Sequence, residues 1–227
     1  MLNKKKFLKR HNTQLFSSVL MLVVIIDYGM GNLGSLRRAM YECGAHNLLV
    51  SNNTEDIEAA DALILPGVGA FAEGMKNLRE YNLNRLIRKK TLDDHVPLLG
   101  ICLGMQLLAT LGHEGGDIEG LNIISGDVKK MKPISRDERI PHVGWNNVYL
   151  KNKNALFKDI VDGSDFYFVH SYQFIPENLE DIIGATPYCG SFVSALNHGS
   201  VWGVQFHPEK SSILGFKVLK NFLGTME

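Results

Sequence analysis

The sequence contains few cysteines and no excess of charge of either sign. Its three cysteines, Cys43, Cys102 and Cys189, form no C-x-x-C pair. This argues against a disulfide framework or a zinc knuckle and favours a reducing compartment, so we expect the protein in the cytoplasm. The 24 basic and 24 acidic side chains give a formal net charge of zero. That balance argues against a broad nucleic-acid or membrane footprint.

Long apolar runs, repeats and linkers are also missing from the sequence. No run reaches the roughly 18–20 apolar residues that a membrane span needs. With 227 residues, of which 45% are hydrophobic, the chain can bury a core without a disulfide or a metal. Its 22 glycines argue against a coiled coil. We therefore predict one globular domain over residues 21–227.

The first 20 residues differ from the rest in character. Four lysines and an arginine between positions 4 and 10 precede an apolar run over 19–26, a combination that imitates a secretory signal peptide. No small-residue cleavage site follows, and cleavage there would remove the first predicted core strand. We interpret 1–20 as a basic extension ahead of the domain, with Met21 as an alternative start that the sequence does not decide.

The first half of the chain alternates between strand and helix patterns. Continuous apolar runs predict strands buried on both faces, and periodic apolar positions predict the helices between them. The predicted strands are 22–27, 47–50, 62–65 and 96–100, and the predicted helices are 33–43, 72–90 and 105–111. This alternation predicts a layered α/β fold with a largely parallel central sheet flanked by helices.

The second half is rich in strand patterns joined by short connections, which predicts an antiparallel or mixed extension of the sheet. The runs are 123–130, 145–149, 166–170, 182–185, 192–197 and 201–206, and a closing helix is predicted over 212–223.

The segment Gly100-Ile101-Cys102-Leu103-Gly104 lies between a predicted strand and a predicted helix. A nucleophile elbow needs such glycines, because they let the chain turn sharply and leave the central side chain projecting. Cys102 would then lie at a helix N-terminus that favours the thiolate. The Leu103 N–H would face a developing oxyanion. The alternative is a small buried cysteine between two packing glycines.

A thiol nucleophile needs a base and a group that orients the base. His207 follows a predicted strand directly, in the triplet His207-Pro208-Glu209. The proline stiffens this turn, so His207 could hold one ring orientation with Glu209 beside it. A histidine that caps a strand end is the simpler alternative. Two metal ligands are another, but the sequence offers no convincing third ligand.

Residues 100–106 (GICLGMQ) together with His207-Pro208-Glu209 resemble the class I glutamine amidotransferases. Three further segments resemble one family within that class, the glutaminase subunits of imidazole glycerol phosphate synthase in histidine biosynthesis. They are 65–71 (LPGVGAF), 141–146 (PHVGWN) and 207–211 (HPEKS). The resemblance covers 21–227 and leaves the basic extension outside. It implies the class I glutamine amidotransferase fold and an enzyme without cofactor or metal.

The resemblance also implies roles for individual residues. Cys102 would attack the side-chain amide of glutamine and form a glutamyl thioester, with His207 as base and Glu209 as its partner. The oxyanion donors would be the backbone at Leu103 and at Val68 or Gly69. The residues implied to hold the glutamine are Gln106, His170, Ser171 and Tyr172.

A partner is implied as well. In the family, ammonia passes to a (β/α)₈-barrel cyclase subunit, which makes imidazole glycerol phosphate and aminoimidazole carboxamide ribotide. Asn32, Trp145 and Lys210 match positions near that docking surface. A core tryptophan is the commoner fate for Trp145.

Three alternatives stay open at this point. A paralogous subunit would supply ammonia for amidation of a surface-polysaccharide sugar. A binding module would keep the fold without turnover, although the intact triad argues against it. A cysteine peptidase would use the same thiol, but Gln106 beside the elbow fits amidotransfer better. Outside the site, we expect His142 and His198 to be surface groups, and Cys43 and Cys189 to be packing residues.

Overall fold

The computed structural model describes residues 21–226; the predicted basic extension, 1–20, lies outside the described residues. A nine-stranded mixed sheet runs through the molecule in the order β2-β1-β3-β4-β13-β12-β11-β8-β9. The first five strands in this order are parallel, and those from β12 to β9 pair antiparallel with their neighbours. The predicted parallel sheet with an antiparallel extension is therefore confirmed.

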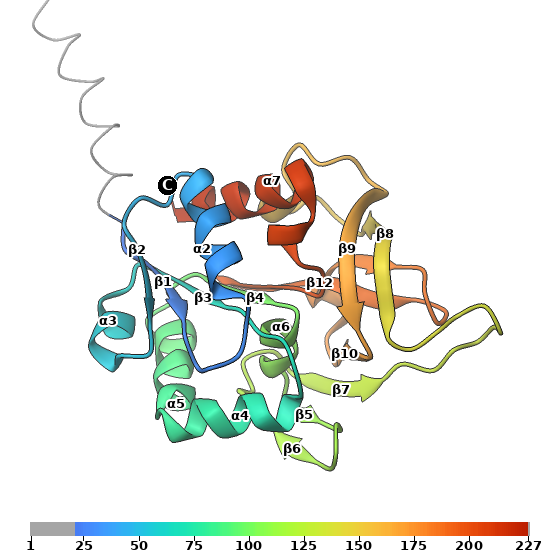
Figure 1. Ribbon diagram of the computed structural model, residues 1–227, viewed down its shortest axis with the longest axis horizontal. Coiled ribbons are helices and arrows are strands. Elements are labelled where there is room, and N and C mark those ends of the chain that lie inside the picture. Colours follow the sequence, from blue (N-terminus) through green and yellow to red (C-terminus); the bar gives the residue numbers. More distant parts are fainter. Residues whose placement is uncertain (1–20, 227) are drawn as a thin grey trace, which may run out of the picture.

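The parallel half has helices on both of its faces (Figure 1). Its strands are β1 (Val23–Ile26), β2 (Leu48–Ser51), β3 (Ala62–Leu65), β4 (Leu98–Ile101) and β13 (Val201–Val204). One face is covered by α2 (Leu33–Glu42) and α7 (Ser212–Leu223), and the other by α3 (Thr54–Ala59), α4 (Phe71–Glu80), α5 (Leu83–Arg88) and α6 (Leu103–Leu107). All strands of this half except β2 are buried along their whole length, as their uninterrupted apolar sequences predict.

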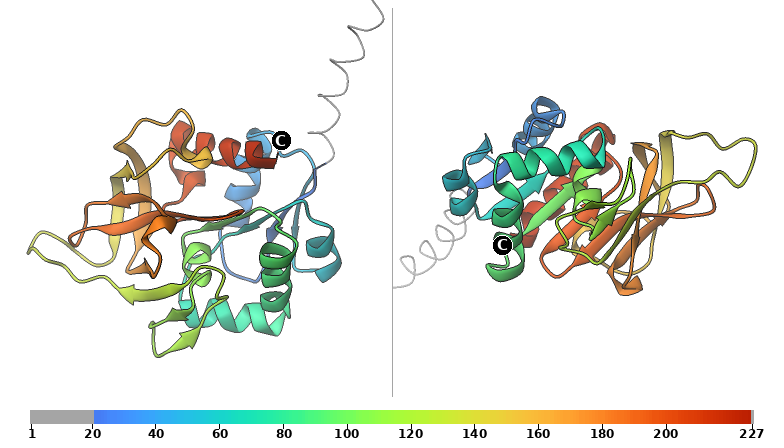
Figure 2. Two further views of the ribbon diagram at one scale, coloured as in Figure 1. Left: turned by 180° about the vertical axis from the view of Figure 1, so that it is seen from behind. Right: turned by 90° about the horizontal axis from the view of Figure 1, so that it is seen from below.

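The antiparallel half lies beside the helical half in both views of Figure 2. It is built from β8 (His142–Leu150), β9 (Ser164–His170), β11 (Ile182–Thr186) and β12 (Phe192–His198). A second sheet has the order β10-β7-β5-β6, with β5 (Leu111–Gly112), β6 (Ile118–Glu119), β7 (Gly126–Lys130) and β10 (Tyr172–Pro176). Between β9 and β10 stands only Ser171, so the chain leaves the large sheet and enters the small one at that residue.

Short helical turns complete the fold, and no helix within 21–226 is long and apolar enough to cross a membrane. The turns are a π-helical turn, η1 (Lys89–Asp93), and the 3₁₀ turns η2 (Ala155–Phe157), η3 (Leu179–Asp181), η4 (Pro208–Lys210) and η5 (Gly224–Met226).

Two predicted helices are shorter in the structure. The helix predicted over 72–90 is broken at Asn82, which takes a left-handed conformation (φ 57°) that asparagine tolerates. The helix predicted to reach Leu111 ends at Leu107, because Leu111 belongs to β5. The strand predicted to begin at Ile123 begins at Gly126. The N–H groups of Ile123 and Ile124 bond instead to the carbonyl of Leu108, at the end of α6.

A close contact joins α6 to the sheet. A Cβ atom at Gly104 would lie 1.8 Å from the carbonyl oxygen of Leu65 on β3. A Cβ atom at Gly100 would lie 2.9 Å from the carbonyl oxygen of Gly104 and from the backbone of Met105. Backbone atoms on both sides leave no room for a side chain, so these two glycines allow α6 to begin directly above the ends of β3 and β4.

We expect Gly104→Ala to lower the free energy of unfolding by about 3 kcal/mol, because backbone must move to admit the new methyl group. Gly34→Ala on α2 is the matched control. Gly34 is exposed and nothing lies within 4 Å of its Cβ position, so this change should raise stability by about 0.5 kcal/mol. Urea unfolding of both variants measures the difference. Equal stability of the two variants would contradict the packing argument.

Candidate active site

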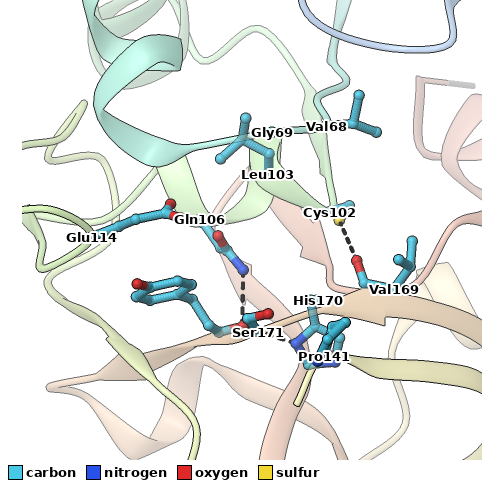
Figure 3. Close-up of a pocket in the computed structure, with 11 residues that line it drawn as sticks. Val68, Gly69, Cys102, Leu103, Gln106, Glu114, Pro141, Val169, His170 and Ser171 are labelled. Atoms are coloured by element: carbon cyan, nitrogen blue, oxygen red, sulfur yellow. Dashed lines mark hydrogen bonds between the residues drawn. The ribbon is translucent and has the colours of Figure 1, made fainter.

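A pocket of about 340 Å³ opens where the parallel strands end, next to the junction of the two sheets (Figure 3). Open α/β sheets bind ligands at this carboxyl edge. The lining residues are Val68, Gly69, Cys102, Leu103, Gln106, Glu114, Pro141, Val169, His170, Ser171 and Tyr172. The structure thus brings together all the residues predicted to bind glutamine, the predicted nucleophile and the predicted oxyanion donors.

Cys102 occupies the turn between β4 and α6 in a strained conformation. Its φ and ψ are 53° and −108°, a region that a residue with a side chain rarely adopts. The N–H of Cys102 donates to the carbonyl of Val204 on β13 at 2.8 Å. The sulfur lies 3.6 Å from Nε2 of Gln205 and 3.8 Å from the carbonyl oxygen of Val169. The surrounding hydrogen bonds therefore hold the thiol at the pocket wall.

His207 and Glu209 form a buried pair behind Cys102. Nδ1 of His207 lies 2.9 Å from Oε1 of Glu209, and their side chains are 3% and 5% exposed. Burial lowers the pKa of His207, but the Cys102 and Glu209 side chains outweigh it and raise that pKa to about 9. Nε2 of His207 has no hydrogen-bond partner within 21–226. The ring is thus held from one side and has its second nitrogen free for a proton transfer.

The turn that carries His207 is fixed by its own backbone. The N–H of His207 donates to the carbonyl of Tyr167 on β9 at 2.9 Å, and the hydroxyl of Ser211 donates to the carbonyl of His207 at 2.6 Å. Pro208 begins the 3₁₀ turn η4 that follows. The predicted stiffness of the His-Pro-Glu turn is visible in these contacts, and it limits rotation of the imidazole.

Gln106 lies one helical turn after Cys102, and its side-chain amide is hydrogen-bonded within the protein. Its Nε2 donates to the carbonyl of Tyr172 at 3.0 Å and to Oε1 of Gln205 at 2.8 Å. Gln205 is fully buried and was not predicted as a site residue. Its position directly after the strand β13 and two residues before His207 is the sequence signal that could have singled it out.

The predicted oxyanion donors meet in one corner of the pocket. The N–H of Leu103 donates to the carbonyl of Gly67 at 3.3 Å, so this donor is occupied. Gly69, with φ +108°, and Val68 continue the same turn along the pocket wall. The hydroxyl of Tyr28 donates to the carbonyl of Pro66 at 2.6 Å and anchors the start of the turn.

His142 was expected at the surface, and that prediction is wrong. It is 4% exposed, and its Nδ1 lies 3.0 Å from Nε2 of His170, which is equally buried. Burial lowers the pKa of His142 to about 4. Burial, together with the nearby His142 and His207, lowers the pKa of His170 to about 3. The periodicity could not reveal this pair, because it forms only when β8 and β9 place the two residues opposite each other. His198 is exposed, and its Nδ1 lies 3.1 Å from Oδ1 of Asp181.

Glu114 is a second residue that sequence reasoning missed. It follows β5 in a loop, where nothing in its local pattern marks it out. In the structure it lines the pocket, and its Oε2 accepts a hydrogen bond from the N–H of Phe71 at 2.8 Å. It contributes the one acidic side chain among the residues that line the pocket.

Of the three residues predicted to lie at a docking surface, Asn32 lies beside the His207–Glu209 pair, and Trp145 and Lys210 lie against Tyr167. Asn32 accepts a hydrogen bond from the N–H of Ser35 at the start of α2 and lines a small cavity shared with His207 and Glu209. The Trp145 side chain is half exposed, and its ring centroid lies 6.1 Å from that of Tyr167. Nζ of Lys210 lies 5.9 Å from the centroid of the same Tyr167 ring.

Known proteins resemble this chain over most of its length. A family model described as glutamine amidotransferase class-I matches residues 24–225. The imidazole glycerol phosphate synthase subunit HisH of Moorella thermoacetica is 46% identical over 88% of this chain and 93% of that protein. The subunit HisH 2 of Methanococcus maripaludis is 45% identical over 89% and 98%, and HisH of Aquifex aeolicus is 43% identical over 89% and 96%.

Solved structures agree in fold. A crystal structure of a glutamine amidotransferase superposes with a TM-score of 0.69 at 19% identity, over 89% of this chain and 98% of that one. The glutaminase domain of Trypanosoma brucei CTPS superposes with a TM-score of 0.65 at 16% identity, over 91% and 93%. The predicted fold and the predicted class of enzyme, a glutamine amidotransferase, are confirmed. The chain belongs to the class I glutamine amidotransferase family and, within it, to the HisH family.

Proposed function

We propose that the chain is the glutaminase subunit of an imidazole glycerol phosphate synthase and acts in the cytoplasm. It hydrolyses glutamine and passes ammonia to a (β/α)₈-barrel cyclase subunit, which makes imidazole glycerol phosphate and aminoimidazole carboxamide ribotide. The observation that carries the proposal is the strained Cys102 turn beside the buried His207–Glu209 pair. The likeness to HisH subunits supports the choice of acceptor.

The positions of the three side chains support the following reaction. The sulfur of Cys102 attacks the carboxamide carbon of glutamine, and His207 holds the thiol proton. The C–N bond then breaks, and His207 gives that proton to the departing ammonia. A water molecule attacks the resulting thioester, releases glutamate and returns the thiol. Glu209 balances the imidazolium whenever His207 holds the extra proton, since its Oε1 lies 2.9 Å from Nδ1 of His207.

The oxyanion formed in the attack needs two backbone donors. We assign these to the N–H of Leu103 and to the N–H of Val68 or Gly69. The carbonyl of Gly67 now accepts the Leu103 N–H, so this peptide must turn away before Leu103 can serve the oxyanion. Glycine at 67 and 69 permits that rotation because it tolerates both signs of φ.

The lining residues offer a binding group for each end of a glutamine molecule. In the view of Figure 3, Glu114 and Cys102 lie on opposite sides of Gln106. We assign the carboxylate of Glu114 to the α-ammonium group of the substrate, because a charge-assisted hydrogen bond there would orient the carboxamide toward Cys102. The backbone at Ser171 and Tyr172, with Gln106, would hold the rest of the amino-acid end.

The cyclase would dock at the surface that holds Asn32, Trp145 and Lys210. A half-exposed tryptophan beside a tyrosine is a typical anchor of a protein interface. Lys210 directly follows Glu209, so an acidic group on the cyclase that binds Lys210 would act close to the catalytic carboxylate.

The first prediction concerns glutamate release from glutamine by the purified chain. A histidine-pathway cyclase with its ribonucleotide ligand should stimulate the release, and Cys102→Ala should abolish it. Lys210→Ala should reduce the stimulation and leave alkylation of Cys102 by iodoacetamide unchanged. If glutamate release depends on Cys102 but is not stimulated by this cyclase, the proposed ammonia acceptor is wrong and the result points to sugar amidation. No release under either condition would contradict the whole proposal.

The second prediction concerns the charge on His207. Glu209→Gln removes one of the two groups that raise the pKa of His207, so less imidazolium supports the Cys102 thiolate. We expect the alkylation rate of Cys102 by iodoacetamide to fall about tenfold at pH 7. The difference should disappear near pH 10, because His207 with its pKa of about 9 is then neutral in the wild-type protein as well. Equal rates at pH 7 would refute the role of Glu209.

The third prediction concerns the charge of Glu114. Glu114→Gln keeps an oxygen that can accept the Phe71 N–H and removes the negative charge. We expect the KM for glutamine to rise tenfold or more, with a smaller effect on kcat, because the α-ammonium loses a charged partner. Glu73→Gln, the same change at an exposed position of α4, is the control and should leave KM unchanged. If the KM of Glu114→Gln is unchanged, a group other than the Glu114 carboxylate binds the α-ammonium of glutamine.

A further inference from the structure

The proposed reaction uses neither of two buried histidines, His170 in the pocket wall and His142 behind it. His142 begins β8 and His170 ends β9, and the antiparallel register pairs the two residues directly. His142 stacks on Tyr188 with ring centroids 4.1 Å apart and also packs against Phe168 and Phe192. Nδ1 of His142 lies 3.0 Å from Nε2 of His170. A polar contact this deeply enclosed by aromatic rings must be satisfied, because an unpaired nitrogen there is costly.

Hydrogen bonds at both ends determine where the protons of this pair lie. At one end, Nδ1 of His170 lies 2.8 Å from the carbonyl oxygen of Tyr172. A carbonyl can only accept, so Nδ1 of His170 carries the proton and its Nε2 is an acceptor. That acceptor requires a proton on Nδ1 of His142.

The other end leads to the same assignment. The N–H of Asn147 donates to Oδ1 of Asn146 at 2.8 Å, which leaves Nδ2 of Asn146 to face His142. That Nδ2 lies 3.3 Å from Nε2 of His142, so this nitrogen accepts and Nδ1 again carries the proton. All the hydrogen bonds therefore run one way, from Asn146 through His142 and His170 to Tyr172. A second proton on either ring would place two N–H groups face to face.

This series of hydrogen-bonded groups forms a relay that ends at the pocket. The carbonyl oxygen of Tyr172 accepts from Nδ1 of His170 and from Nε2 of Gln106, so both of its lone pairs are used. Ser171 and Tyr172 line the pocket at the point where the chain passes from the large sheet to the small one. The carbonyl of Tyr172 is thus held by two hydrogen bonds, and the one from His170 depends on His142.

We propose that His142 is a positioning residue for the glutamine pocket, which through His170 fixes the Tyr172 carbonyl and with it the Ser171–Tyr172 backbone. This inference rests on the proposed glutaminase activity and adds to it a residue without contact to the thiol or to the substrate. The relay requires both imidazole rings to be neutral, and burial among aromatic side chains disfavours the charged form of each ring. Two titratable groups face the pair. Tyr188 stacks on His142, and the positive charge of His207 disfavours a positive charge on His170.

The variants His142→Leu and His142→Asn distinguish the effect of the hydrogen-bond donor from the effect of ring packing. Leucine leaves Nε2 of His170 without a donor, so we expect the KM for glutamine to rise about tenfold, with the rate of Cys102 alkylation by iodoacetamide within about twofold of wild type. Asparagine can place an amide N–H near the position of Nδ1 and should restore KM to within about threefold. His198→Leu, the same change at an exposed histidine, should leave KM unchanged. Thermal unfolding of each variant identifies any that do not fold.

Two results would overturn the proposal. One is a wild-type KM in folded His142→Leu. The other is an equal rise in KM for His142→Leu and His142→Asn, which would show that ring packing rather than the donor matters.

A second measurement does not depend on activity. Long-range ¹H–¹⁵N spectra of the full chain labelled with ¹⁵N-histidine should show His142 and His170 as neutral Nδ1–H tautomers from pH 7 to pH 5.5. Titration of either ring in that range, or Nε2–H tautomers, would refute the relay even if glutamine is hydrolysed. If the wild-type protein releases no glutamate and the tautomers are as expected, the proposed function fails and the relay stands.

Discussion

The backbone hydrogen bond from Cys102 to Val204 joins the two parts of the proposed catalytic machinery. It extends the parallel pairing of β4 with β13, in which Ile101 lies opposite Val204. The proposed nucleophile follows the end of one strand and the proposed base follows the end of its neighbour, so a single register places Cys102 and His207 together although they are distant in the chain. The close approach of α6 to β3, which only glycine at 104 allows, fixes the turn from the other side.

His207 and His170, two buried histidines near Cys102, differ in the direction of their pKa shifts. His207 faces Glu209 and Cys102, which raise its pKa to about 9, whereas burial together with two neighbouring histidines lowers the pKa of His170 to about 3. The first ring can carry a charge that the reaction uses, and the second stays neutral and serves as a hydrogen-bond link. The partner of each ring, a carboxylate in one case and a second imidazole in the other, decides which role is available.

The sequence pattern predicts the layered fold and the candidate triad because both depend on local features. Buried parallel strands read as uninterrupted apolar runs, and a nucleophile turn needs its glycines at fixed spacing. Glu114, Gln205 and His142 escaped prediction for the opposite reason: each becomes part of the site only through pairing between distant strands or through a loop that folds over the pocket. The break at Asn82 was missed because apolar periodicity continues on both sides of a single left-handed residue.

The two sheets carry different residues of the proposed site. Cys102, His207 and Glu209 follow strands of the large sheet, whereas Glu114 follows β5 and Tyr172 begins β10 in the small sheet. In the proposed reaction, the large sheet therefore carries the bond-breaking groups and the small sheet carries groups that bind the amino-acid end of glutamine. The chain crosses between them at Ser171, and Tyr172 is held there by hydrogen bonds from Gln106 on one side and His170 on the other. Gln106 of α6 links the two groups, because its backbone N–H donates to the carbonyl of Cys102 and its side chain donates to the carbonyl of Tyr172. A shift of one sheet against the other would therefore act through Gln106 on the proposed nucleophile and on the substrate-binding backbone together.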